Sequence, residues 1–115
     1  MDAPFIGIDV ARDRLDVHVR PSQQSFAVAR NGAGVAELVE RLREFAPALI
    51  AVEATGGFGT IVVAALAGEA LPVVVVNPAQ VRHYAQALGK RAKTDPIDAA
   101  VIARFAQAAK PAVRA

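Results

Sequence analysis

Four acidic residues occupy positions from which they could bind metal ions together. Asp9 and Glu53 each follow a short apolar run of strand length, and ligands of mixed α/β sheets bind in the crevice at the carboxyl ends of strands. Asp95 and Asp98 are three residues apart at a predicted helix start, so we expect their side chains to share one face. Four carboxylates in one pocket would raise one another's pKa values. Because Mg²⁺ and Mn²⁺ prefer oxygen ligands, either ion would relieve this repulsion.

Such a site would suit phosphodiester chemistry. Two ions about 4 Å apart can activate an attacking oxygen and stabilise a leaving oxygen. The chain contains no cysteine, which excludes disulfides and thiolate metal sites. Each acid also has a structural interpretation, because Asp9 could belong to a turn, and Asp95 could cap a helix whose first turn holds Asp98. From the residues alone, both interpretations stay open.

The apolar pattern predicts the elements that would position these acids. Residues 15–20 alternate between apolar and polar, as in a half-buried strand, with His18 on its polar face and without an evident partner. Residues 73–76 are apolar throughout, as in a strand covered on both faces. The predicted order is βββαβαβαα, with strands near 5–8, 15–20, 26–28, 49–52 and 73–76, and helices near 35–45, 55–67, 78–88 and 95–110.

This order defines an α/β fold. A leading meander followed by β-α crossovers predicts a mixed five-stranded sheet with helices on both faces. That is the RNase H-like arrangement, whereas a flavodoxin-like fold would lack the meander. If the strands that precede Asp9 and Glu53 are neighbours, the two carboxylates should meet near one crevice.

The bulk composition limits the class of protein. A chain of 115 residues, with 54% hydrophobic residues and a mean hydropathy of +0.33, fits one well-buried domain. No apolar run approaches the roughly 20 residues that cross a bilayer, and no basic stretch precedes an apolar one at the N-terminus. We therefore expect a cytoplasmic protein without a membrane partner.

One interval of the chain is purely basic. The net charge of +2 is too small to indicate a polyanionic partner, but no acid lies between Glu69 and Asp95. Cations there could bind backbone phosphates, although basic residues near a helix C-terminus also favour the helix dipole. His83 lies in the same interval, and we expect it to be a surface residue. The predicted nucleic-acid contacts are Arg82, Lys90, Arg91 and Lys93.

Several motifs match a known family in their order along the chain. They are Phe5–Ala11 (FIGIDVA), Val52–Gly57 (VEATGG), Asn77–Arg82 (NPAQVR) and Ala87–Ala99 (ALGKRAKTDPIDA). Together they resemble the N-terminal DEDD domain of the insertion sequence one-ten family of bacterial transposases. The resemblance spans nearly the whole chain, and its most specific part is the KTDPIDA segment.

The resemblance implies a fold like that of the Holliday-junction resolvase RuvC and a DNA transposase that cleaves and transfers strands with Mg²⁺. By motif position, the catalytic, metal-binding D-E-D-D tetrad would be Asp9, Glu53, Asp95 and Asp98. Members of the family are also implied to choose DNA with a guide-like RNA and to work as homo-oligomers.

The resemblance further implies a separate C-terminal domain with a nucleophilic serine. This chain stops at Ala115, and its two serines, Ser22 and Ser25, lie in the meander outside any matching motif. We therefore expect residues 1–115 to be one RNase H-like domain that lacks the serine-bearing domain and cannot complete recombination alone.

Two other functions remain as alternatives. Gly7-Ile8-Asp9 after a strand also opens the actin-like fold of sugar kinases and ATPases, but residues 11–14 are not glycine-rich and 115 residues cannot supply a second lobe. A non-catalytic nucleic-acid-binding or assembly module is the other alternative. Such a module would tolerate loss of the four acids.

Overall fold

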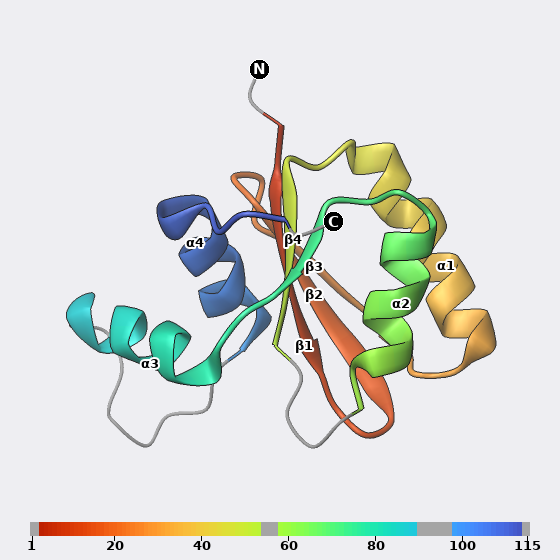
Figure 1. Ribbon diagram of the computed structural model, residues 1–115, viewed down its shortest axis with the longest axis horizontal. Helices are drawn as coiled ribbons and strands as arrows, with labels where there is room; N and C mark the ends of the chain where they lie inside the picture. Colours follow the sequence, from red (N-terminus) through yellow and green to blue (C-terminus); the bar gives the residue numbers. More distant parts are fainter. Residues whose placement is uncertain (1–2, 54–57, 90–97, 114–115) are drawn as a thin grey trace.

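The computed structural model describes residues 3–53, 58–89 and 98–113 (Figure 1). Within these ranges the chain follows the predicted order βββαβαβαα. The strands are β1 (Phe5–Val10), β2 (Arg14–Arg20), β3 (Gln24–Ala29), β4 (Leu49–Glu53) and β5 (Val73–Val75). The helices are α1 (Gly32–Phe45), α2 (Thr60–Gly68), α3 (Pro78–Ala87) and α4 (Ala99–Ala109).

The strands form one mixed sheet in the order β3-β2-β1-β4-β5. Hairpins pair β1 with β2 and β2 with β3 in antiparallel fashion, whereas β1–β4 and β4–β5 are parallel. The two parallel pairs follow from the crossovers through α1 and α2. The central strands β1 and β4 therefore run side by side and end at the same edge of the sheet.

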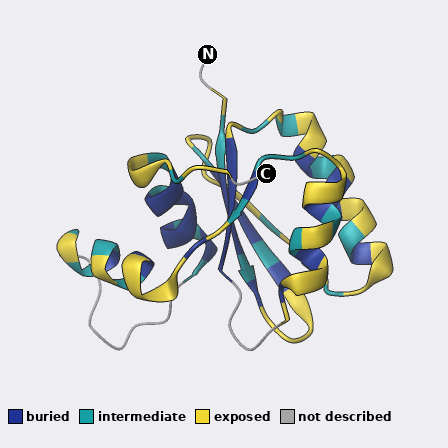
Figure 2. Ribbon diagram, in the orientation of Figure 1, coloured by how far each residue is buried: buried dark blue, intermediate teal, exposed yellow. Residues whose placement is uncertain are grey.

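Helices cover both faces of this sheet, as predicted. On one face α1 and α2 pack against alternate strand residues (Figure 2), and this main core includes Ile6, Ile8, Leu15, Val17, Leu38, Leu42, Ile50, Val52 and Leu66. On the other face α4 lies over β1, β2 and β4, with α3 beside it. This second core includes Leu49, Ala51, Val81, Val101, Ile102 and Phe105.

The backbone of α4 rests directly on β1 at Gly7. A Cβ atom at this position would lie 2.4 Å from both the backbone nitrogen of Ala103 and the carbonyl oxygen of Ala99. Only a residue without a side chain allows this approach. Gly7 thus fixes how closely the N-terminal half of α4 sits on the sheet.

Asparagine side chains cap α1 and α3 at their starts. The side chain of Asn31 accepts a hydrogen bond from the Gly34 backbone N–H at the start of α1, and Asn77 caps α3 in the same way through Ala79. Both satisfy backbone donors that a helix start leaves unpaired.

Three predicted features differ in the structure. The second helix starts at Thr60, not near residue 55, because residues 58 and 59 form a turn before it. The last helix starts at Ala99, not near Asp95, and Asp98 is its N-cap. The strand β5 is a short edge strand, so Val75 is 57% exposed, although the apolar run predicted cover on both faces.

Within the described ranges, no helix is both long and apolar enough to span a membrane.

The close approach at Gly7 can be tested by adding one methyl group. Gly7→Ala should lower the free energy of unfolding by about 2–3 kcal/mol, because the α4 backbone must move away from β1. Urea denaturation measures the change. Gly68→Ala is the matched control, since a Cβ there meets nothing within 4 Å. Equal stability of Gly7→Ala and wild type would contradict the direct seating of α4 on β1.

Candidate active site

Three carboxylates lie side by side on the adjacent strands β2, β1 and β4, at the end of the sheet where β4 stops. Asp9 in β1 is paired with Glu53, the last residue of β4, and on its other side with Asp16 of β2. Directly paired residues point to the same face of a sheet. Because Ile8 and Val10 point into the main core, these three acids lie on the face that α4 covers. The condition stated from the sequence, that the strands bearing Asp9 and Glu53 are neighbours, is therefore met.

A fourth carboxylate reaches this face from α4. Asp98 precedes the helix, and its Oδ1 accepts a hydrogen bond of 2.9 Å from the backbone N–H of Val101. It is near enough to Asp9 for its charge to raise the pKa of Asp9. The structure thus brings Asp98 near Asp9. Asp98 is itself the N-cap, whereas the structural interpretation made Asp95 the cap and placed Asp98 in the first turn of the helix.

The electrostatics of Asp9 reflect this crowding. Burial first, and then the negative charges of Glu53, Asp16 and Asp98, together raise the pKa of Asp9 to about 6, whereas Arg14 acts in the opposite direction. Ionised Asp9 is consequently unfavourable in the protein alone. A cation at this position would remove the penalty.

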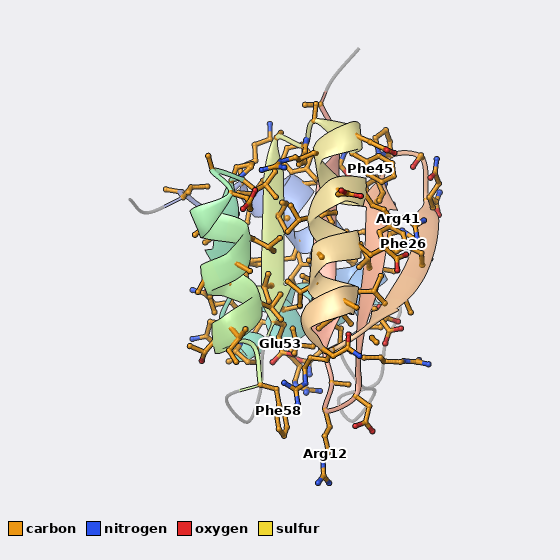
Figure 3. All side chains as sticks on the ribbon, turned by 90° about the vertical axis from the view of Figure 1, so that its right-hand side faces the viewer. Arg12, Phe26, Arg41, Phe45, Glu53 and Phe58 are labelled. Carbon is orange, nitrogen blue, oxygen red and sulfur yellow. The ribbon has the colours of Figure 1, made fainter. Side chains whose placement is uncertain are left out.

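Glu53 is more buried than Asp9, Asp16 and Asp98. Its side chain is only 5% exposed, although it stands at the end of β4, where the chain leaves the sheet. Arg12 lies in the turn that follows β1, and Figure 3 shows Glu53 and Arg12 at the same end of the molecule. A carboxylate buried to this degree needs a hydrogen-bonding or charged environment.

An open pocket of about 510 Å³ lies beside these acids. Its lining includes Asp9, Asp16 and Asp98, together with Arg14 and the start of α4. The pocket also contains His18, which the alternation of β2 placed on a polar face without a partner. The expectation that His18 has no partner was wrong, because His18 lies beside Ser25 of β3, and α4 covers this face of the sheet. His18 is 8% exposed and its Nδ1 lies 2.6 Å from the Oγ of Ser25, within hydrogen-bonding distance.

Burial also governs the charge of His18. Desolvation, followed by the positive charge of Arg20, lowers the pKa of His18, while Asp98 acts in the opposite direction. The imidazole therefore favours its neutral form, which suits the short contact with the Ser25 hydroxyl.

The donor atoms match a hard divalent cation, because Asp9, Glu53 and Asp98 supply only carboxylate oxygens. A cation beside Asp9 would counter the burial and the neighbouring negative charges that raise its pKa. Among the residues that the structure describes, no three acids or histidines are close enough together to hold one ion. Asp95, the remaining member of the predicted tetrad, lies outside the described residues.

The predicted basic contacts are described only in part. Arg82 lies on α3 and is half-buried, next to the exposed His83. Lys90, Arg91 and Lys93 lie outside the described residues. The basic segment therefore stays a prediction.

Sequence reasoning missed Asp16 and the role of His18 in the pocket. The signal was present, because a hairpin that pairs Val10 with Leu15 must also pair Asp9 with Asp16. Placing the turn at residues 11–13 and extending the register by one pair would have found the third carboxylate. To predict that His18 lines the pocket, one would also have to know that α4 covers β2.

Comparison with known proteins identifies the family of this chain. The chain belongs to the DEDD transposases of the insertion sequence one-ten family, whose family model, described as a transposase, matches residues 6–114. Pilin gene-inverting proteins of Moraxella lacunata and Moraxella bovis are each 28% identical over 117 residues. These matches cover 96% of this chain and 36% of each relative, so the chain spans just over a third of their length.

Solved structures establish the fold. The structure of Thermus thermophilus RuvC matches with a TM-score of 0.58 and 20% identity, covering 89% of this chain and 93% of that one. The RNase H-like expectation is thereby confirmed. An inorganic polyphosphate/ATP-glucomannokinase from Arthrobacter sp. strain KM matches with a TM-score of 0.50 and 23% identity, covering 75% of this chain and 48% of the kinase. At such low identity both likenesses show the fold alone.

The unfavourable charge on Asp9 predicts how stability depends on pH. The folded-state pKa of about 6 exceeds the usual aspartate value of 3.8, so ionisation of Asp9 causes a loss of stability as pH rises from about 4 through 6. Asp9→Asn removes this loss and, without divalent ions, should be more stable than wild type by about 1 kcal/mol at pH 7.5, after allowance for solvent screening. Urea denaturation across this pH range measures the difference.

Asp13→Asn is the control, because it removes the same charge from an exposed turn. A stability difference between Asp9→Asn and wild type that stays constant from pH 4 to pH 7.5 would contradict the raised pKa.

Proposed function

We propose that this chain is the metal-dependent catalytic domain of a DNA transposase, which takes part in DNA strand cleavage and transfer during insertion-sequence transposition. The observation that carries the proposal is the register of β1 with β4, which pairs Asp9 with Glu53 beside the start of α4. Family membership and the RNase H-like fold support the same conclusion.

In this proposal Asp9, Glu53, Asp95 and Asp98 hold Mg²⁺ or Mn²⁺. Bound ions of this kind activate an attacking oxygen and stabilise a leaving oxygen in phosphodiester chemistry. The chain's own residues contribute placement: the sheet register aligns Asp9 with Glu53, and the N-cap bond fixes the side chain of Asp98. Burial of Glu53 restricts its movement and keeps bulk water from one side of the site.

The proposal treats residues 1–115 as one domain of a larger cytoplasmic enzyme. Because the chain covers 36% of the curated relatives, the proposed enzyme includes further segments. The family resemblance implies that one of them is a C-terminal domain with a nucleophilic serine. The full-length enzyme would bind DNA, would use a structured guide-like RNA, and would act as a homo-oligomer. Ser25 contacts His18 in the meander and is not assigned the nucleophilic role.

Metal binding is the direct test of the acid site. Millimolar Mg²⁺ or Mn²⁺ should raise the Tm of the chain, by about 4 °C or more when the ion is at tenfold its Kd, because the ion binds the folded state. Asp9→Asn and Glu53→Gln should lose this rise. Differential scanning fluorimetry measures it, with Asp13→Asn as the control.

Asp98 allows its two roles to be separated. Asparagine caps helices as well as aspartate does, so Asp98→Asn should leave the Tm without metal nearly unchanged while reducing the metal-induced rise. Asp98→Ala should also lose about 1 kcal/mol of stability with the cap. If neither ion shifts the wild-type Tm and Asp9→Asn behaves like wild type, the proposed metal site is wrong.

Nucleic-acid binding tests the basic segment. The chain should bind branched DNA or structured RNA with an affinity that falls as salt rises, because phosphate contacts release counterions. Changing Lys90, Arg91 and Lys93 together to alanine should weaken binding and reduce the log–log salt slope by about two to three. Fluorescence anisotropy measures both quantities. Arg43→Ala is the control, since Arg43 pairs with Glu69, and unchanged affinity in the triple variant would reject the segment as a contact.

A further inference from the structure

An arginine and an aromatic ring meet at the turn before α2. The guanidinium carbon of Arg30 lies 4.9 Å from the ring centroid of Phe58, and its Nε donates a hydrogen bond of 2.5 Å to the carbonyl oxygen of Arg12. These residues come from three separate connections: the turn after β1, the turn after β3 and the turn before α2. Arg30 therefore ties the three connections together.

This cluster lies at the acid-bearing end of the sheet. Arg12 follows Asp9 by three residues, and Phe58 follows Glu53 by five. Figure 3 shows Glu53, Phe58 and Arg12 at the same end, with the side chains of Phe58 and Arg12 directed away from the fold. The acids lie on the α4 face, whereas Arg30 and Phe58 belong to connections on the α1–α2 side. A strand of nucleic acid would meet both by crossing this end of the sheet.

Stability of the core does not explain the exposure of this aromatic ring. Phe58 is 38% exposed and Ile61, the second residue of α2, is 72% exposed, and neither belongs to the core clusters. Next to them is a hollow of about 220 Å³ lined by Arg30, Asn31, Gly32, Val35, Ile61 and Val62. The hollow combines a largely apolar lining with a cation at its rim.

The hairpin near the cluster carries exposed charges of both signs. Asp13 and Asp16 are the nearby acids of the hairpin, and Asp16 pairs with Arg14 at 3.3 Å. Arg12 is exposed in the turn between β1 and β2. Phosphate groups could therefore be met by Arg12 and by the guanidinium edge of Arg30.

A second arginine–aromatic pair, Arg41 with Phe26, lies against the main core. Arg41 lies 3.6 Å from the ring centroid of Phe26, and Arg41 is also within 3.5 Å of Glu37 on its own helix. Phe26 packs against the main core, and Figure 3 shows the pair well away from Glu53. This pair joins α1 to β3 and provides a matched control.

We propose that Arg12, Arg30 and Phe58, with the adjoining hollow, bind an unpaired base and its flanking phosphates in the DNA strand beside the acid site. The proposal rests on the proposed function, because it assumes that DNA reaches these carboxylates. An aromatic face stacks on any base without sequence preference, and a guanidinium adds cation–π and phosphate contacts. A base within a duplex keeps its own stacking partners, so the surface selects unpaired DNA.

The test uses the 115-residue chain and one labelled oligonucleotide, offered as single-stranded DNA, as a duplex, and as RNA of the same sequence. Single-stranded DNA should bind most tightly by fluorescence anisotropy. Phe58→Ala should weaken it by about tenfold, Arg30→Ala should weaken it comparably, and Phe58→Tyr should retain binding. The fluorescence of a 2-aminopurine base in the strand should be quenched by wild type and not by Phe58→Ala.

Arg41→Ala removes an equal charge from the control pair and should leave affinity within twofold of wild type. The proposal would be overturned if Phe58→Ala kept the wild-type affinity, or if Arg41→Ala lost as much affinity as Phe58→Ala. Binding of duplex or RNA as tight as that of single-stranded DNA would also overturn it. The metal-induced rise in Tm separates the two hypotheses. It should persist in Phe58→Ala, whereas its absence from wild type would count against the acid site and not against base binding.

Discussion

The parallel pairing of β1 with β4 is the interaction on which the site depends. Its register sets Asp9 beside Glu53, and the hairpin from β1 to β2 adds Asp16 on the other side. Carboxylates on adjacent strands repel one another, and burial makes that repulsion stronger. The apolar side chains on the opposite face of the same strands hold the register despite this cost. The raised pKa of Asp9 is the electrostatic consequence.

The placement of α4 follows from the same strand. Gly7 lets the helix backbone approach β1 so closely that Asp98, in its N-cap position, reaches the neighbourhood of Asp9. The cap bond to Val101 and the electrostatic contact with Asp9 belong to one side chain, so a structural role and a proposed catalytic role coexist. The same helix covers β2 and encloses His18 with Ser25 in the wall of the pocket.

Much of the fold and part of the site were predictable from sequence. Apolar runs that end in an acid identified Asp9 and Glu53, and the change from period two to helical spacing gave the order of the elements. The start of α4 was misplaced because Asp95-Pro96 and Asp98 both carry helix-start signals, and local chemistry does not choose between them. The buried state of His18 and the contact of Arg30 with Phe58 depend on packing between distant segments, which periodicity does not contain.

A cation among the carboxylates is the central claim, since it turns an electrostatic penalty into a catalytic site. A crystal of the chain grown with Mn²⁺ and measured at the manganese absorption edge tests it most directly. Anomalous density in contact with carboxylate oxygens of Asp9 and Glu53 is expected. Well-ordered Asp9 and Glu53 side chains without an ion, in a crystal where Mn²⁺ binds elsewhere, would contradict it.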